Sequence, residues 1–459
     1  MPAGLSMGLL LDFAYLVACV VLSPWILYRL ISVADRRELG MRFGFGLGAP
    51  LEGCIWLHGS SAGEVSLLKP LVALLERDFP STPLVVSAFT STGLAAARKL
   101  YPQHRIVPFP FDLSFVVRRD LRRFDPRLVI IVESEFWPNF ITAARRRDIP
   151  LVVVNGKMSA KSYRIHSRAR LIPRVLTQLK LIAAQTEEHA QRLRSLGVAE
   201  QRIRVTGNMK YDLARAQSDG AQGRELRRKL GYQTDDVVVI GGSLHEQEDE
   251  ALLDAYGAAV EVSDRAALII VPRYPADAQI VEQHARQRGY AAVLKTAVDR
   301  GEQAPPGRRG VLIVDTVGEL GVLYGAADVA FVGGSLFYRG SNKGGHNLME
   351  PAILGVPVLF GPYNFSFKET VEDLLAADAG LLVRDAAELN AALVKLTASS
   401  QQRHELGQRG QQVVRKGQGA TSRNYDLIVE LLVAQAQRLQ PPSFNRKMPR
   451  AASGPDSPL

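Results

Sequence analysis

Short apolar runs alternate with stretches of helical spacing along most of the chain, and this alternation predicts an α/β fold. The runs are rich in Val, Ile and Leu, as is typical of parallel strands buried on both faces. The stretches between them, such as residues 65–77, repeat apolar positions at the spacing of a helix. Two such series predict two Rossmann-like, doubly wound domains. The predicted strands are residues 54–57, 84–87, 128–132, 151–154, 181–184 and 204–206 in the first half, and 237–241, 267–271, 311–315, 329–332 and 356–360 in the second.

A polar, strand-free segment separates the two series, so we expect two domains joined by a linker. Ligands of such sheets bind beyond the carboxyl ends of the strands, and the polar motifs of this chain follow apolar runs. Two facing sheets with an interdomain cleft are therefore expected. The expected divisions are an N-terminal membrane segment at 1–36, a first domain at 37–213, a linker at 214–233, a second domain at 234–440 and a disordered tail at 441–459.

The N-terminus carries one long apolar stretch, residues 7–33, which Asp12 and Pro24 interrupt. Its length is sufficient for a helix that spans a bilayer. No Lys or Arg precedes Arg29, whereas three more arginines follow closely, which predicts that the rest of the chain lies on the cytoplasmic side. A helix that enters only one leaflet also fits the two interruptions, and a buried core helix is the alternative to both.

The composition narrows the class of partner. The chain has 459 residues, a net charge of +10 and a pI near 9.6, which indicates an acidic partner: nucleic acid, an anionic membrane or a phosphorylated substrate. No basic motif interleaved with aromatic residues occurs, so we do not expect nucleic acid. The sequence has no GxxxxGK[ST], HExxH or CxxC motif and no GxGxxG in its first half. The sequence therefore predicts no ATP hydrolysis, no metalloprotease chemistry and no classical dinucleotide redox cofactor.

The most informative stretch is residues 328–362. An apolar run ends in Gly333-Gly334-Ser335, a glycine-rich loop follows, and a helix is predicted to begin near Asn347. Glycine amides and a helix N-terminus together favour an anion, and Glu350 is placed to accept hydrogen bonds from sugar hydroxyls. The alternative is an ordinary turn between a strand and a helix.

Three motifs of the first half offer acid–base chemistry. HGSSAGE, residues 58–64, follows a strand and ends in Glu64, which could take a proton from a hydroxyl nucleophile. ESEFWPN, residues 133–139, places Glu133 and Glu135 directly after another strand. In GNMKYD, Lys210 could meet developing negative charge. The alternatives are a helix N-terminal charge for Glu64, a helix cap for Glu133 or Glu135, and a solvated surface side chain for Lys210.

Three motifs of the second half offer anion and base contacts. Ser243 of GGSLHEQE could bond a phosphate or a carboxylate, while His245 in the same motif could equally cap a helix. Arg273 stands between two prolines immediately after a strand, so its guanidinium is held rigidly for a bidentate contact with an anion. The loop at 315–320 could supply backbone contacts to a base.

Taken together, these motifs resemble the Kdo transferases, which are 3-deoxy-D-manno-octulosonic acid transferases of lipopolysaccharide synthesis. The resemblance extends from the N-terminal segment to about residue 430. It rests on eight motifs in the order of the family: HGSSAGE, ESEFWPN, NGKMSAKS, GNMKYD, GGSLHEQE, PRYP, DTVGEL and GGHNLMEP.

The resemblance implies a membrane-attached glycosyltransferase of the GT-B type that transfers Kdo from CMP-Kdo to a lipid A precursor, with no metal requirement. It implies that Glu64 is the general base and that Glu135 and Lys210 support the transition state. The acceptor and the anchor imply a location at the cytoplasmic leaflet of the inner membrane. The residues implied to hold CMP are Ser243, Pro272, Arg273, Val317, Gly318, Glu319, Gly345, His346, Asn347 and Glu350.

The sequence departs from the pattern of the family at three places. Tyr274 and Ala276-Asp277 stand where the family more often has His and then Glu-Arg, Val317 replaces a Met, and the segment before Gly344-Gly345 is longer than usual at 338–343. A different transferase of the same fold, which uses another nucleotide-sugar on a membrane lipid, is the second hypothesis. A binding protein without turnover is a third, and the presence of Glu64, Glu135 and Lys210 argues against it.

Overall fold

The structure is a computed structural model that describes residues 33–439, apart from 169–170, 215 and 341–343, together with residues 12, 13, 15 and 17. Most of the predicted membrane segment and all of the predicted tail lie outside the described residues. Among the described residues, no helix combines the length and the apolar character needed to cross a bilayer. The chain forms two compact units: the first runs to Thr206 and resumes at Ser422, and the second comprises Gly207–Thr421.

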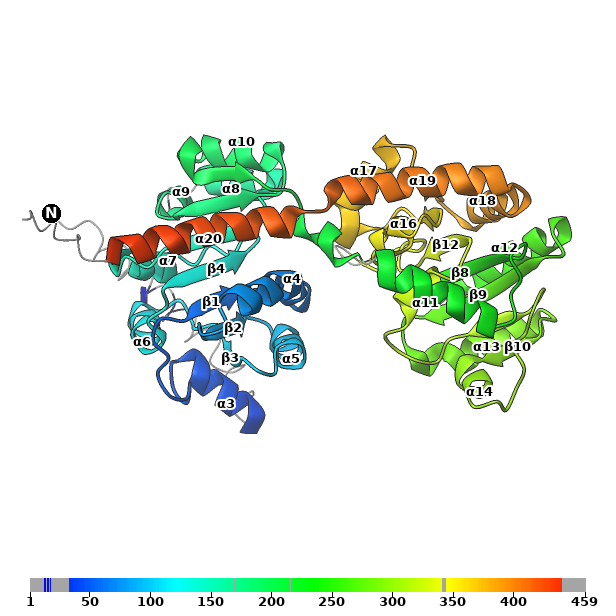
Figure 1. Cartoon of the computed structure of the whole chain (residues 1–459), viewed down its shortest axis with the longest axis horizontal. Coiled ribbons are helices and arrows are strands. Elements are labelled where there is room, and N and C mark those ends of the chain that lie inside the picture. The colour runs from blue at the N-terminus through cyan, green and yellow to red at the C-terminus, as the bar shows by residue number, and fades with distance from the viewer. Residues whose placement is uncertain are drawn as a thin grey trace, which may run out of the picture. The chain divides into compact units, whose positions relative to one another are not determined.

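The first unit is built on a parallel sheet of seven strands in the order β3-β2-β1-β4-β5-β6-β7 (Figure 1). Strand β1 pairs with β2 on one side and with β4 on the other, with Trp56 opposite Val85 and Val129. The strand order reverses between β1 and β4, which is where doubly wound sheets bind ligands. The strands are β1 Ile55–His58, β2 Leu84–Ala88, β3 Arg105–Pro108, β4 Leu128–Val132, β5 Leu151–Gly156, β6 Leu181–Ala184 and β7 Ile203–Val205.

Helices cover both faces of this sheet, and aromatic residues fill its core. The indole of Trp56 packs edge-on against Phe124 and Phe140 at ring distances of 5.1 and 5.3 Å. Helix α20, red in Figure 1, belongs to this unit from Ser422 onward, and the Tyr425 hydroxyl donates to Asp78 at 2.5 Å. The helices are α3 Val33–Arg42, α4 Ala62–Asp78, α5 Ser91–Leu100, α6 Ser114–Phe124, α7 Pro138–Arg146, α8 Ala160–Arg168, α9 Leu171–Leu176, α10 Glu187–Ser195, the 3-10 turn η1 Glu200–Arg202 and α20 Ala420–Leu439.

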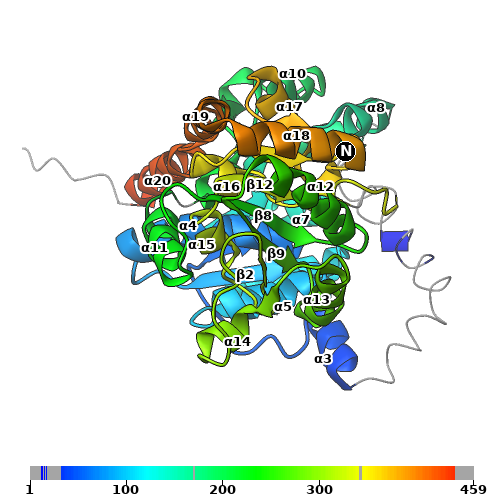
Figure 2. The same ribbon diagram turned by 90° about the vertical axis from the view of Figure 1, so that its right-hand side faces the viewer.

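The second unit repeats the plan with seven parallel strands in the order β10-β11-β9-β8-β12-β13-β14. Its strand order reverses between β8 and β12. Helices α12 and α18 lie side by side on this sheet (Figure 2). The strands are β8 Val237–Leu244, β9 Ala266–Pro272, β10 Ala292–Leu294, β11 Val311–Ile313, β12 Val329–Val332, β13 Val358–Phe360 and β14 Leu381–Leu382. The helices and 3-10 turns are η2 Met209–Leu213, α11 Ala216–Lys229, α12 Glu248–Val262, η3 Pro275–Asp277, α13 Ala278–Gln287, α14 Lys295–Asp299, α15 Leu320–Tyr324, α16 Met349–Ile353, η4 Phe365–Phe367, α17 Lys368–Ala376, α18 Ala386–Ala398 and α19 Ser400–Gly417.

The predicted linker at 214–233 is wrong, because most of it is helix α11 within the second unit. Its polar composition suggested a solvated connection, yet the helix approaches α15 so closely that a Cβ at Gly223 would lie 2.3 Å from the carbonyl carbon of Gly325. The predicted domain limits also change. The first unit ends at Thr206 instead of residue 213, and the second ends at Thr421 instead of residue 440.

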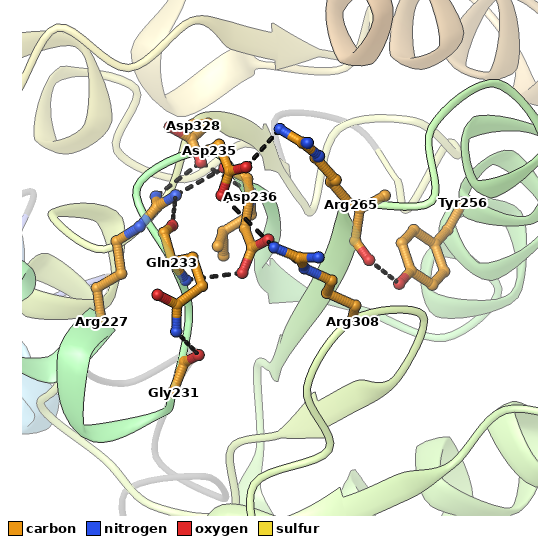
Figure 3. A network of polar contacts seen from close by, with 11 residues as sticks. Arg227, Gly231, Gln233, Asp235, Asp236, Tyr256, Arg265, Arg308 and Asp328 are labelled. Carbon is orange, nitrogen blue, oxygen red and sulfur yellow. Dashed lines mark hydrogen bonds and ion pairs between the residues drawn. The ribbon is translucent and has the colours of Figure 1, made fainter.

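A polar network ties α11 to the amino ends of the strands in the second unit (Figure 3). Asp328, just before β12, accepts hydrogen bonds from the Arg227 guanidinium at 2.7 Å and from the Val238 amide at 2.8 Å. Asp236, just before β8, pairs with Arg308 at 2.5 Å. These contacts secure the amino ends of the sheet, and they leave the carboxyl ends for the motifs described next.

Candidate functional site

In each unit, two of the predicted motifs lie at the carboxyl ends of the strands that flank the reversal of strand order. In the first unit, HGSSAGE follows β1 and ESEFWPN follows β4, and these strands are neighbours. In the second unit, GGSLHEQE overlaps the end of β8 and the glycine loop follows β12, again on neighbouring strands. The sequence predicted that these motifs follow strands, and the strand order brings them together in pairs within each unit.

Glu64 lies at the start of α4, where it completes the cap of the helix. The Ser60 amide donates to Glu64 Oε2 at 2.8 Å, and the Ser61 hydroxyl donates to Oε1 at 3.0 Å. The pKa of Glu64 is raised to about 7: burial is the largest cause, the negative charges of Glu133 and Glu135 act in the same direction, and the hydrogen bonds from Ser60 and Ser61 oppose the rise. A carboxyl group with this pKa can accept a proton near neutral pH and is a suitable general base.

Glu133 and Glu135 bring two more carboxylates to the same edge. Burial raises the pKa of Glu135, and the charge of Glu133 acts in the same direction. Glu133 holds a left-handed backbone with φ of 61°, as does Asn155 on the neighbouring strand with φ of 53°. The Asn155 amide donates to Glu133 Oε1 at 3.4 Å. Non-glycine residues held in this conformation cluster at functional sites, so Glu133 joins the candidate residues.

His58, the first residue of HGSSAGE, is buried and packs against neighbouring residues of the first unit. Its ring stacks on Phe109 with centroids 3.9 Å apart, and Nδ1 lies 3.0 Å from the Ser87 hydroxyl. Burial lowers the pKa of His58 to about 3, which favours the neutral imidazole at neutral pH.

Lys210 lies in η2, at the beginning of the second unit. Its amide is capped by the Asn208 side chain at 3.0 Å. Because Glu64 and Glu135 belong to the first unit, a joint role for the three residues stays a prediction.

The glycine loop after β12 does bind an anion, but the anion is a side chain of the chain itself. The carboxylate of Glu248, the first residue of α12, is 1% exposed. It accepts hydrogen bonds from four backbone amides: Gly334 at 2.6 Å and His245 at 2.9 Å on Oε2, and Ser335 and Leu336 at 2.9 Å each on Oε1. These four amides are therefore already engaged by a side chain of the chain itself.

The GGHNLMEP motif forms a compact turn ahead of a short helix. The predicted start of the helix near Asn347 is two residues early, because α16 begins at Met349 and has five residues. The Asn347 side chain accepts from the Met349 amide at 3.1 Å and donates to Glu350 at 3.1 Å. Asn347 and Glu350 therefore present their polar groups together at the carboxyl end of β12.

A cluster of four basic side chains lies beside this turn. The rings of His245 and His346 stack within 11° of parallel, with their Nε2 atoms 3.0 Å apart. The pKa of His346 is lowered to about 4, mainly by burial and also by the charges of His245, Arg273 and Arg339. Within the part of the chain that the structure describes, neither the guanidinium of Arg273 nor that of Arg339 forms an ion pair. The cluster is therefore suited to an anionic ligand, and Arg339 is a member that the sequence did not identify.

The remaining predicted residues surround this cluster. Ser243 has φ of 57° at a register shift between β8 and β9, and Pro272 ends β9. Val317 is 78% exposed beside Gly318, which has φ of 91°. The carboxylate of Glu319 is already engaged, since Lys295 lies 2.9 Å away and the Thr316 hydroxyl donates at 2.6 Å. Glu319 therefore stabilises the loop that presents Val317 and Gly318.

Comparison with known proteins agrees with these observations. A family model described as 3-deoxy-D-manno-octulosonic-acid transferase (kdotransferase) matches residues 37–213. The 3-deoxy-D-manno-octulosonic acid transferase of Haemophilus influenzae is 31% identical over 91% of this chain and 97% of its own length. That of Bordetella pertussis is 32% identical, over 85% of this chain and 90% of its own length.

Among solved structures, the UDP-GlcNAc 2-epimerase from Neisseria meningitidis bound to UDP-GlcNAc matches with a TM-score of 0.54 at 14% identity, over 83% of this chain and 99% of that one. At this identity the likeness shows the fold alone. The identity and coverage of the two transferases, together with the family model, are decisive. The chain belongs to the 3-deoxy-D-manno-octulosonic acid transferase family.

Proposed function

We propose that this chain transfers Kdo from CMP-Kdo to a hydroxyl group of a lipid A precursor of the lipid IVA type, with inversion and without a metal ion. Membership of the family supports the sugar and the reaction class. The observation that carries the mechanism is Glu64, whose carboxyl group has a pKa of about 7 at the strand-order reversal of the first sheet.

In the proposed step, the acceptor hydroxyl attacks the anomeric carbon of Kdo while its proton passes to the carboxylate of Glu64. The bond between that carbon and the phosphate oxygen of CMP breaks, and CMP leaves with the electron pair. A direct displacement of this kind inverts the anomeric centre. Glu135 and Lys210 are proposed to stabilise the charge that develops during the transfer.

The second unit is proposed to hold the donor through its basic cluster. Arg273 is fixed in position because its amide donates to the Leu244 carbonyl at 2.7 Å, which continues the sheet beyond β9. Its guanidinium suits the phosphate of CMP, and Asn347 and Glu350 suit the hydroxyls of the ribose. Fixed guanidinium groups of this kind can take the role that a metal ion has in other transferases. The further proposed contacts are Ser243, Pro272, Val317, Gly318, Glu319, Gly345 and His346.

The location at the cytoplasmic leaflet of the inner membrane is also a proposal. The apolar segment within 1–36 and the net charge of +10 both support attachment to an anionic membrane that carries the lipid acceptor.

The test is the isosteric variant Glu64→Gln, with the exposed Glu52→Gln in the same unit as its matched control. Loss of a general base lowers the rate by about 10²- to 10⁴-fold. We expect a loss of this size in transfer from radiolabelled CMP-Kdo to lipid IVA, with CMP affinity unchanged by calorimetry. Turnover of Glu64→Gln at the rate of Glu52→Gln would exclude Glu64 as the base.

A panel of donors tests the second hypothesis, in which another nucleotide-sugar is used on a lipid. We expect transfer from CMP-Kdo and none from UDP-hexoses. If wild type binds CMP and transfers no Kdo to the lipid, the proposed function is wrong.

A further inference from the structure

Asp12 is a carboxylate in the middle of an apolar segment, and the structure shows what it binds. Its Oδ1 accepts from the Ser114 amide at 2.9 Å, and its Oδ2 accepts from the Ser114 hydroxyl at 2.5 Å. The side-chain amide of Asn139 donates to Oδ1 at 3.2 Å. A charged group in an apolar segment is unfavourable unless it has partners, and these partners belong to the folded body of the first unit.

These contacts supply a helix cap that the local sequence lacks. Helix α6 begins at Ser114, and its N-cap residue Leu113 has no side chain that could accept a hydrogen bond from the first turn. The carboxylate of Asp12 takes that place from 102 residues earlier in the chain. A carboxylate at this position satisfies a free amide and interacts favourably with the helix dipole.

Helix α7 also lacks a cap from its own N-cap residue, and a carboxylate from elsewhere in the chain supplies it. Its N-cap residue is Trp137, which forms no capping hydrogen bond. The buried carboxylate of Asp112 accepts instead from the amides of Asn139 at 3.0 Å and Phe140 at 2.7 Å. The Tyr15 hydroxyl donates to the same carboxylate at 3.4 Å, so a second residue of the N-terminal segment reaches the start of a helix.

The capped ends lead directly to the candidate site. Asn139 is the last residue of ESEFWPN, and it is held both by Asp12 and by the Asp112 carbonyl, the latter at 2.6 Å. Two residues earlier, Trp137 packs on Phe89 with ring centroids 5.1 Å apart. Glu135 lies two residues earlier still. A shift in the start of α7 would therefore be passed along this short loop to Glu135.

We propose that Asp12 is a positioning residue: it fastens the N-terminal segment to the starts of α6 and α7 and thereby holds the loop that carries Glu135. The proposal rests on the proposed function, because Glu135 is assigned there to the transition state. It gives the N-terminal segment a second role, in which its polar residues set the geometry of the site while its apolar residues meet the membrane.

The two roles fall on different residues. Asp12 and Tyr15, three residues apart, contact the body of the first unit. Phe13 and Val17, four residues apart, are 68% and 47% exposed. Residues three or four apart share a face of a helix, so substitutions can remove one role and leave the other.

The experiment uses the full chain in detergent micelles and in membranes, with Asp12→Ala, Asp12→Asn and the matched control Phe13→Ala. We expect Asp12→Ala to lower kcat for Kdo transfer about tenfold, with the KM for CMP-Kdo unchanged and retention in membranes unchanged. Asp12→Asn keeps one oxygen acceptor for the Ser114 amide and should restore part of kcat. Phe13→Ala should weaken retention in membranes and leave kcat in micelles unchanged.

A double-mutant cycle with Ser114→Ala tests the contact itself. The losses of Asp12→Ala and Ser114→Ala should not multiply, either in kcat or in the thermal unfolding of the first unit. Independent effects, or an Asp12→Ala enzyme with the kcat of wild type, would overturn the proposal, as would a loss of membrane retention equal to that of Phe13→Ala. If wild type transfers no Kdo, the proposed function fails, and the unfolding cycle still decides the contact.

Discussion

The two sheets of this protein each have seven parallel strands and one reversal of strand order, but different ionisable groups gather at their carboxyl ends. The first unit gathers the carboxylates of Glu64, Glu133 and Glu135, and the second gathers two histidines with Arg273 and Arg339. Each unit also places a glutamate at the start of the helix that follows its central strand. Glu64 has one backbone amide and one hydroxyl as partners, whereas Glu248 has four backbone amides.

This difference in hydrogen-bond partners gives the two glutamates different roles: Glu64 is suited to proton transfer, and Glu248 to holding a loop in place. Hydrogen bonds from amides stabilise the ionised form of a carboxylate, and burial among other carboxylates destabilises it. Glu64 has few amide donors and two acidic neighbours, so its carboxyl group exchanges a proton near neutral pH. Glu248 accepts two amide hydrogen bonds on each oxygen, and it serves to hold the glycine loop after β12.

The largest expected effect is on the free energy of unfolding, when Glu248 and Glu64 are each replaced by alanine in separate variants. Each buried donor that loses its partner costs about 1–3 kcal/mol. Glu248→Ala should therefore lower the free energy of unfolding of the second unit by about 4 kcal/mol or more, and Glu64→Ala should change that of the first by about 1 kcal/mol. Urea unfolding can separate the units, since Trp56 and Trp137 lie in the first and residues 207–421 include no tryptophan, while circular dichroism reports on both. Equal destabilisation by the two variants would contradict the comparison.

Much of the fold could be predicted because central strands carry a strong apolar signal. Every predicted run corresponds to a strand of the structure. The three strands that the sequence missed, β3, β10 and β14, all lie at the edges of the sheets, and each is partly exposed. An edge strand is covered less completely, so it needs no continuous apolar run.

The candidate site could be predicted only where a contact is local in sequence. Arg273 stands directly after β9 and Glu64 in the first turn of the helix after β1, and the sequence singled out both from these positions. The partner of the glycine loop was not, because Glu248 reaches Ser335 from 87 residues away. Arg339 lies in the segment at 338–343, where the sequence departs from its family, and this departure was the available signal. The role of Asp12 had no local signal, since it depends on contacts with α6 and α7.

The next largest effect concerns the basic cluster of the second unit. A hydrogen bond to a charged group contributes about 1.5–3 kcal/mol, which corresponds to roughly a tenfold to hundredfold change in affinity. We expect Arg273→Gln and Arg339→Gln each to weaken CMP binding by that factor in calorimetry. Arg384→Gln, an exposed arginine of the same unit paired with Glu388, is the matched control. Wild-type affinity in Arg339→Gln would remove Arg339 from the site.

A smaller effect is expected in the pH dependence of the transfer rate, which tests the interaction between the carboxylates of the first unit. The base form of Glu64 is lost as the pH falls below its pKa of about 7, so the rate of transfer should fall with it. Glu133→Gln removes one negative charge beside Glu64 and lowers its pKa. The acid limb of the rate profile should then move down by roughly half a unit to one unit. A profile that superposes on that of Glu52→Gln would show that Glu133 does not act on Glu64.

The smallest expected effect is on the protonation of the histidine pair in the second unit. It extends the comparison between the carboxyl ends of the two sheets. With the Nε2 atoms of His245 and His346 3.0 Å apart, a hydrogen bond between them requires a proton on one nitrogen and none on the other. Burial and the charges of Arg273 and Arg339 keep the pKa of His346 near 4, so the pair is neutral at pH 7. A bound phosphate opposes the charges of the two arginines and raises the pKa of the pair.

Binding of CMP should therefore be accompanied by proton uptake at the histidines, and affinity should rise by a few-fold between pH 7.5 and pH 6. The phosphate of CMP also titrates near pH 6, so the informative quantity is the ratio of Kd values at the two pH values, compared between wild type and His346→Asn. The contribution of the phosphate is common to both proteins, and the contribution of His346 is absent from the variant. We expect the ratio to differ by roughly threefold, which corresponds to about 0.6 kcal/mol of linkage. Equal ratios would show that the pair stays neutral when the ligand binds. If the ratios differ as expected, acid acts on the two edges in opposite directions, since it removes the base of the first unit while it strengthens the hold of the second unit on CMP.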